Sequence, residues 1–435
     1  AGDAASPTLD HVPGGGSGGP VPEDAGLDSE HEKKSRLERY GFMERLEMRW
    51  MITRLSALVL VAATVMLVGG RTAHAQFGQA ANIGKLMRPE YTRADVRIFV
   101  EGLELDETQR VLVESMFEDY QDEFDAGFQG LRDRLANMRD EIDPNDPEGA
   151  RRAVFEPFND WRDERTAIGE RLLSNVQIIL NGQQLEAWDA FRRKLVREKT
   201  LRDGQFAGEH LNLFYVLRDM DLPRDVTKVI QPTVTEYDLA LHESLLRRNY
   251  LVEDVEGNML RSLQENDAQL MINTFQQQIN ARIAVRNLND RYIDQIAELL
   301  PPELATAFRE EALKEGYPRV YRRPPVDRMF EAALELETLD PEVREQLTEL
   351  YASFETALDA KNTEVLETIR QHEPQEQLER AKTYTARLAG EPPSRTYNPI
   401  PTALRSRQAL CSDFTRQLQG LLGPETFKEL PGAGR

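Results

Sequence analysis

The chain has 435 residues, of which 54 are Lys or Arg and 75 are Asp or Glu, so its formal net charge at pH 7 is −21. Because so acidic a surface repels phosphate backbones, this charge disfavours nucleic acid as a partner. The single cysteine, Cys411, excludes an intrachain disulfide framework, while a hydrophobic share of 40% suffices for folded cores.

Residues 1–50 differ in composition from the rest of the chain. They begin with alanine and contain a tract rich in Gly, Pro and Ser, which is typical of disorder. Our hypothesis is that translation starts at Met51 and that this stretch is not part of the native protein.

Residues 51–75 have the pattern of a secretion signal. A short basic start leads into the apolar run 55–70, and the small residues Ala73 and Ala75 form the site that a signal peptidase needs. We expect cleavage before Gln76, which would leave a periplasmic or secreted protein without an integral membrane span. The alternative is an uncleaved N-terminal membrane anchor.

A leucine followed by a helix-start pattern recurs at Leu105, Leu222 and Leu339. The two gaps are equal, since 222 − 105 = 117 and 339 − 222 = 117. Apolar residues recur with it in three further columns: Val100, Leu217 and Leu334; Phe117, Val234 and Tyr351; Tyr120, Tyr237 and Phe354. A fixed period of this kind predicts one structural unit used several times.

Each unit is predicted to be a helical hairpin. In the first unit, apolar residues at steps of three and four form two stripes, over 112–138 and 154–179, separated by an Asp- and Pro-rich turn. A short helix is expected before each first signature, over 96–103, 213–220 and 330–337. We therefore predict an all-α fold of three tandem helical hairpins, spanning residues 90–200, 208–322 and 325–430.

A second signature follows in each unit, at Leu180, Leu300 and Leu422. The chemistry that the first and second signatures share is clearest at the first signature of the third unit, where Asp340 can accept hydrogen bonds from the free N–H groups of a helix start. Pro341 is preset for the first helical position, and Leu339 can pack back on the first turn. On physical grounds the motif builds helices and performs no catalysis.

Leucine and glutamine lie four residues apart in two motifs, Leu105 with Gln109 and Leu180 with Gln184, in a helical chain behind a secretion signal. In this pattern the chain resembles the Spy/CpxP (LTxxQ-motif) family of periplasmic helical proteins. The resemblance implies an ATP-independent chaperone or envelope-stress protein whose partners are unfolded or envelope proteins. This chain departs from the family in having three hairpins and no threonine at the second motif position. At the other four sites the glutamine is replaced, by Val226, Leu304, Val343 and Thr426.

The sequence offers few candidate sites for chemistry. Beyond the signal, His210, His242 and His372 are scattered, and residues 76–435 contain no known catalytic motif. We therefore expect no enzyme, no cofactor and no metal site. Phe128 and Phe155 lie off the main stripes and are candidates for an apolar surface that binds unfolded clients; the alternative is that they contact a neighbouring unit.

Three basic clusters stand out in this acidic chain, at 192–194, 247–248 and 322–323. They could attract acidic clients, but intrachain pairing with the abundant carboxylates is the favoured interpretation. The leading functional hypothesis is a non-catalytic binding protein of the envelope that acts as a chaperone. The alternatives are a structural or scaffolding protein with one fixed partner and, third, a metal-responsive sensor.

Overall fold

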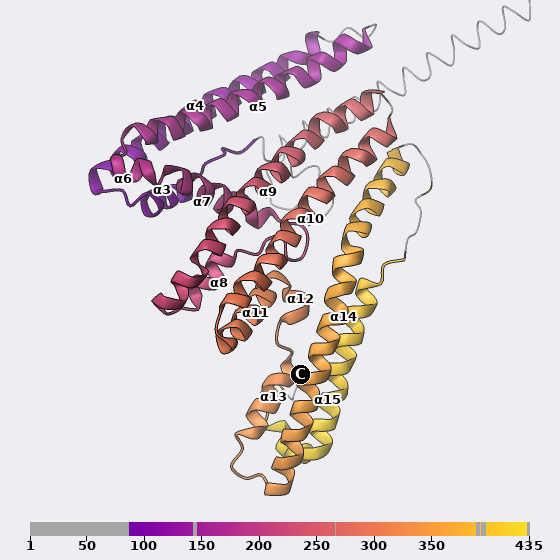
Figure 1. Cartoon of the computed structure of the whole chain (residues 1–435). Coiled ribbons are helices and arrows are strands. Elements are labelled where there is room, and N and C mark those ends of the chain that lie inside the picture. Colours follow the sequence, from indigo (N-terminus) through magenta and orange to yellow (C-terminus); the bar gives the residue numbers. More distant parts are fainter. Residues whose placement is uncertain (1–86, 142–145, 266, 389–391, 393–396, 433–435) are drawn as a thin grey trace, which may run out of the picture. The chain divides into compact units, whose positions relative to one another are not determined.

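The computed structural model describes residues 87–432, apart from 142–145, 266, 389–391 and 393–396. These residues form helices and no strand, which confirms the predicted all-α fold (Figure 1). They lie in one compact unit, Gly78–Arg435. The predicted signal sequence and its cleavage site at Ala73, Ala75 and Gln76 lie outside the described residues, as does the stretch 1–50.

The first helix pair consists of α4 (Glu107–Glu141) and α5 (Pro147–Ile178). Helix α5 starts where sequence chemistry dictates, because the Asp146 side chain accepts a hydrogen bond from the Gly149 N–H and proline occupies the first turn. Three short helices flank the pair: α3 (Val96–Gly102), α6 (Gly182–Glu186) and α7 (Trp188–Thr200). The two long helices bury their apolar stripes, including Phe117, Tyr120 and Trp161, against each other.

The second helix pair consists of α9 (Arg224–Glu265) and α10 (Ala268–Leu299). Its short helices are α8 (Leu213–Asp219), α11 (Pro302–Gly316) and α12 (Pro318–Tyr321). The core between them is built around Tyr237, Val285 and Phe308, all fully buried.

The third helix pair consists of α14 (Pro341–Leu388) and α15 (Ile400–Lys428), with α13 (Pro325–Leu334) before it. Helix α13 begins five residues earlier than the predicted range 330–337, because Pro325 at its first position fits a helix start. Inside α15, Gly423 has a φ of 74°, a left-handed conformation that favours glycine. The chain therefore changes direction next to the last motif leucine, Leu422.

Helix α7 belongs to the first unit in sequence but also packs on the second helix pair. Arg193 and Arg197 of α7 both form ion pairs with Asp238 of α9, and all three side chains are mostly buried. The Arg197 guanidinium also lies 3.9 Å from the centre of the Phe214 ring in α8. The junction between the second and third units is made differently, chiefly by α10 against α14.

The connector between α7 and α8 contains a buried polar cluster. Glu209 is fully buried, and its Oε1 accepts hydrogen bonds from Arg248 over 3.1 Å and from Arg282 over 2.9 Å. Its Oε2 accepts from the backbone N–H groups of Gln205 and Phe206, over 2.7 and 3.1 Å. The connector is thus held inside the second unit by charge pairing that no local sequence pattern reveals.

None of the described helices combines the length and the apolar character that crossing a membrane requires.

Candidate functional site

The two motif glutamines of the first helix pair bind each other. Gln109 and Gln184 are buried, and each donates from Nε2 to the Oε1 of the other, over 2.8 and 2.9 Å. Each also closes a capping box, because its Oε1 accepts from the backbone N–H of Asp106 or Asn181. A further hydrogen bond of 2.8 Å joins Gln109 Nε2 to the carbonyl of Ile179. The motif therefore fastens the start of α4 to the end of α5.

Where the glutamines are absent, other contacts take their place. Val226 and Leu304 are half-buried against the core of the second helix pair. In the third, Arg344 donates over 2.6 Å to each of two carbonyls at the end of α13. All six motif leucines pack against the core of their own helix pair: Leu105, Leu180, Leu222, Leu300, Leu339 and Leu422.

The predicted chemistry of the helix start at Asp340 is confirmed. Its side chain accepts a hydrogen bond of 2.9 Å from the backbone N–H of Glu342, and Pro341 is the first residue of α14. The motif residues therefore cap helices and pack on the cores.

The histidines and the cysteine belong to different elements: His210 to the connector before α8, His242 to α9, His372 to α14 and Cys411 to α15. His210 Nε2 is 3.2 Å from the Glu315 carbonyl oxygen, and His372 lies on α14. His242 is half-buried on α9, where burial and then Arg193 lower its pKa. Within the described part of the chain, no three His, Cys, Asp or Glu side chains lie close enough to hold a metal ion.

Most of the basic clusters have intrachain partners, which is the favoured interpretation of the sequence. Arg192 pairs with Glu170 and Arg323 pairs with Asp327. Arg248 is buried in the Glu209 cluster. Its neighbour Arg247 is exposed, so the cluster at 247–248 is divided between the interior and the solvent.

The predicted client surface at Phe128 and Phe155 has a different character from the one expected. Phe128 is half-buried, with its ring centre 6.1 Å from that of Phe124 and 6.0 Å from that of Trp161. It therefore packs on the core of its own helix pair, because a side chain beside the main stripe still reaches the facing helix. The side chain of Phe155 lies outside the described residues.

Six of the ten large apolar side chains that are exposed among the described residues lie within seven residues of a motif leucine, whereas Leu239, Leu246, Tyr250 and Tyr397 lie elsewhere. The six are Val111, Leu112, Ile178 and Leu185 in the first helix pair and Val229 and Leu299 in the second. We call these six residues the motif-end apolar group. The hydrogen bonds of Gln109 to Ile179 and Gln184 bring the first four to one end of their pair. Leu112 and Val229 occupy the same place in the period, since 229 − 112 = 117.

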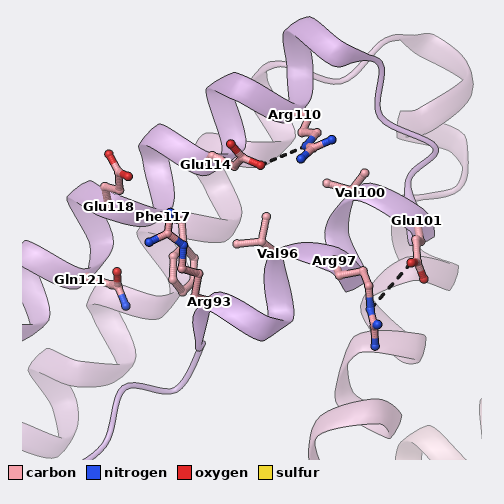
Figure 2. A pocket seen from close by; sticks show the side chains of 10 residues that line it. All are labelled: Arg93, Val96, Arg97, Val100, Glu101, Arg110, Glu114, Phe117, Glu118 and Gln121. Atoms are coloured by element: carbon pink, nitrogen blue, oxygen red, sulfur yellow. Dashed lines mark hydrogen bonds and ion pairs between the residues drawn. The ribbon is translucent and has the colours of Figure 1, made fainter.

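A groove of about 440 Å³ lies between α3 and the first turns of α4 (Figure 2). Its apolar lining consists of Val96, Val100 and Phe117. The polar lining comprises three arginines, three glutamates and one glutamine: Arg93, Arg97, Arg110, Glu101, Glu114, Glu118 and Gln121. We call it the α3–α4 groove.

Each wall of this groove has one ion pair within its own helix. Arg110 contacts Glu114 over 3.0 Å and Arg97 contacts Glu101 over 3.7 Å, and all four side chains are well exposed. Exposed pairs of this kind contribute about 0–1 kcal/mol, so a ligand can replace them at little cost. The groove thus presents charged groups of both signs that can change partner around the half-buried Val100, while Val96 and Phe117 beneath them are only 8% and 2% exposed.

Sequence reasoning missed both the groove and the motif-end apolar group. Arg93 and Arg97 have the spacing of any solvated helix face, and Leu112 belongs to the apolar stripe although it is 42% exposed. The 117-residue alignment was the available signal, because it places Leu112 and Val229 in one column.

Comparisons of the chain with protein-family models, with curated proteins and with solved structures give no match.

Proposed function

We propose that this protein binds other polypeptides without catalysis, as an ATP-independent chaperone of the cell envelope. The observation that carries the proposal is the motif-end apolar group, in which six large apolar side chains stay exposed beside the motifs of two helix pairs. Apolar side chains gathered on a surface are typical of sites for protein partners. The resemblance of the Gln109 and Gln184 motifs to the Spy/CpxP family, and the signal pattern over 51–75, support the envelope location.

The size of the group fits weak binding of many clients. Complete burial of a Val, Leu or Ile side chain stabilises by about 1.5–3 kcal/mol, and these side chains are already partly covered. Four of them at one end of a helix pair would contribute roughly 4–6 kcal/mol before the cost of association is subtracted. A surface of this strength holds an unfolded segment briefly and releases it without nucleotide.

Light scattering of reduced, chemically denatured lysozyme diluted into buffer with the protein tests this function. We expect near-stoichiometric protein to suppress aggregation, and the double variant Ile178→Ser with Val229→Ser to lose most of this effect. Tyr397→Ser is the matched control, since Tyr397 is 77% exposed and Ile178 is 79% exposed. Unchanged suppression by the double variant, or no suppression at several-fold excess, would contradict the proposal.

A scaffolding protein with one fixed partner is the second candidate. The α3–α4 groove favours it, because a shaped groove with charges of both signs discriminates between partners in a way that an apolar surface does not. A single protein recovered in stoichiometric amount, together with failure to suppress lysozyme aggregation, would support the scaffold.

A further inference from the structure

An apolar stripe lies open on helix α9. Leu239 and Leu246 are each 48% exposed, and Tyr250 is 68% exposed. Because these residues are spaced by seven and by four, their side chains lie on one face of the helix, over roughly 16 Å of its length. We call these three residues the α9 stripe.

The neighbouring helices contact other faces of α9. Tyr237 and Leu241 are buried in the core of the second helix pair, where α10 packs on α9. Asp238 binds Arg193 of α7. Helical geometry turns the stripe by about 100° from Asp238 and by more than that from the core residues, so it forms a third face that neither α7 nor α10 covers.

Two opposite charges border one edge of the stripe. Glu243 and Arg247 are exposed, and neither forms an ion pair or a hydrogen bond with another residue that the structure describes. Both lie on the same side of the stripe, Glu243 at a level between Leu239 and Leu246, and Arg247 between Leu246 and Tyr250. An acidic or a basic partner would gain one contact at this edge and meet like charge at the other, whereas a copy of the same edge running the opposite way matches both charges.

We propose that the α9 stripe pairs with the α9 stripe of a second copy of this chain, with the two helices antiparallel. Glu243 of each copy then faces Arg247 of the other, which puts the centre of the pairing at position 245, midway between them. The two Leu246 side chains meet beside the two-fold axis, and Leu239 of each copy packs on Tyr250 of the other. This interface is separate from the motif-end apolar group and does not depend on the proposed chaperone function.

The oligomeric state of the protein of residues 76–435, which contains the whole compact unit Gly78–Arg435, tests the proposal. A contact made by one helix face is small, so we expect a weak dimer, whose weight-average mass in analytical ultracentrifugation rises towards twice the monomer value between about 1 and 100 µM protein.

Charge reversal gives the decisive comparison. Glu243→Arg and Arg247→Glu should each weaken the dimer by at least about tenfold, because each variant turns two symmetric ion pairs into like-charge contacts. An equimolar mixture of the two variants should dimerise again, because each supplies the charge that the other needs. Glu118→Arg and Arg93→Glu are the matched controls, since they reverse exposed charges of the first unit, and they should leave the dimer unchanged.

Cysteine crosslinking tests the direction of the pairing. In a protein with Cys411→Ser, Leu246→Cys should form a disulfide between two copies under mild oxidation, because the two positions lie beside the axis. Leu239→Cys changes an equally exposed position six residues from the centre, so its two copies would lie about 18 Å apart along the helices and should not crosslink.

Four results would overturn the inference. They are a protein that stays monomeric at the highest concentration, charge variants that dimerise like the controls, a mixture of the two variants that stays monomeric, and equal crosslinking from positions 239 and 246.

Discussion

The substitution Glu209→Gln removes the charge at the centre of the buried connector. The carboxylate accepts four hydrogen bonds, two from Arg248 and Arg282 and two from backbone N–H groups. A glutamine amide presents N–H donors where one oxygen was, so two of the four donors lose their acceptor, and both arginines lose their counter-charge. Leaving a buried charge without its partner costs about 3–5 kcal/mol. We expect a loss of that size in the free energy of unfolding.

Urea unfolding followed by two spectroscopic signals distinguishes the first unit from the rest of the chain. In a protein of residues 76–435, which lacks Trp50, the two tryptophans Trp161 and Trp188 are buried in the first unit, so tryptophan fluorescence reports that unit while far-UV circular dichroism reports all helices. In urea, the main circular dichroism transition of Glu209→Gln should move to lower concentration by an amount equivalent to about 3–5 kcal/mol.

An exposed glutamate serves as the control for this prediction. Glu118→Gln changes a carboxylate on the surface of α4, where substitutions usually alter stability by less than about 0.5 kcal/mol. A loss below about 1 kcal/mol in Glu209→Gln would refute the view that the connector is held by its buried charges.

Two further predictions concern the motif and the effect of pH. Gln109→Leu should destabilise the protein by about 1–3 kcal/mol, because it leaves the buried amide of Gln184 without its partner. Adding Gln184→Leu should recover part of the loss, as the apolar Val226 and Leu304 at these places in the second unit suggest. A double-mutant cycle in urea measures the coupling between the two glutamines, and strictly additive losses would contradict it. The pKa of His242 is lowered by burial and by Arg193, so the unfolded chain binds a proton at a higher pH than the folded one. Stability should therefore fall as the pH drops below about 6.5, with a smaller slope in His242→Gln; equal slopes in both proteins would count against this assignment.

The helices themselves follow from local sequence chemistry. Pro341 after Asp340 starts a helix where the sequence predicts one, because capping depends on residues within one turn. Asp146 and Pro147, which the sequence pattern assigned to the turn, start α5 by the same capping chemistry. The beginning of α13 was misplaced by five residues, since the helical start at Pro325 was taken for the end of a loop.

The candidate surfaces depend on contacts that are distant in sequence. Gln109 and Gln184 are 75 residues apart, and nothing in either motif shows that their amides meet. The burial of Glu209 depends on arginines from two different helices of the second pair. Phe128 was expected to be exposed because of its place beside the stripe, but the facing helix brings Trp161 to it. Local patterns predict which face of a helix is apolar, and only the packing decides how much of that face stays open.

Site-specific photo-crosslinking tests the proposed chaperone surface most directly. A benzoylphenylalanine at position 178 places the reactive group beside the motif-end apolar group, and the same residue at position 397 provides a control of nearly equal exposure. With reduced, denatured lysozyme, the account predicts strong crosslinks from position 178, weak ones from position 397, and none with native lysozyme. Equal crosslinking from both positions, or from neither, would contradict the claim that this protein holds unfolded chains at its motif ends.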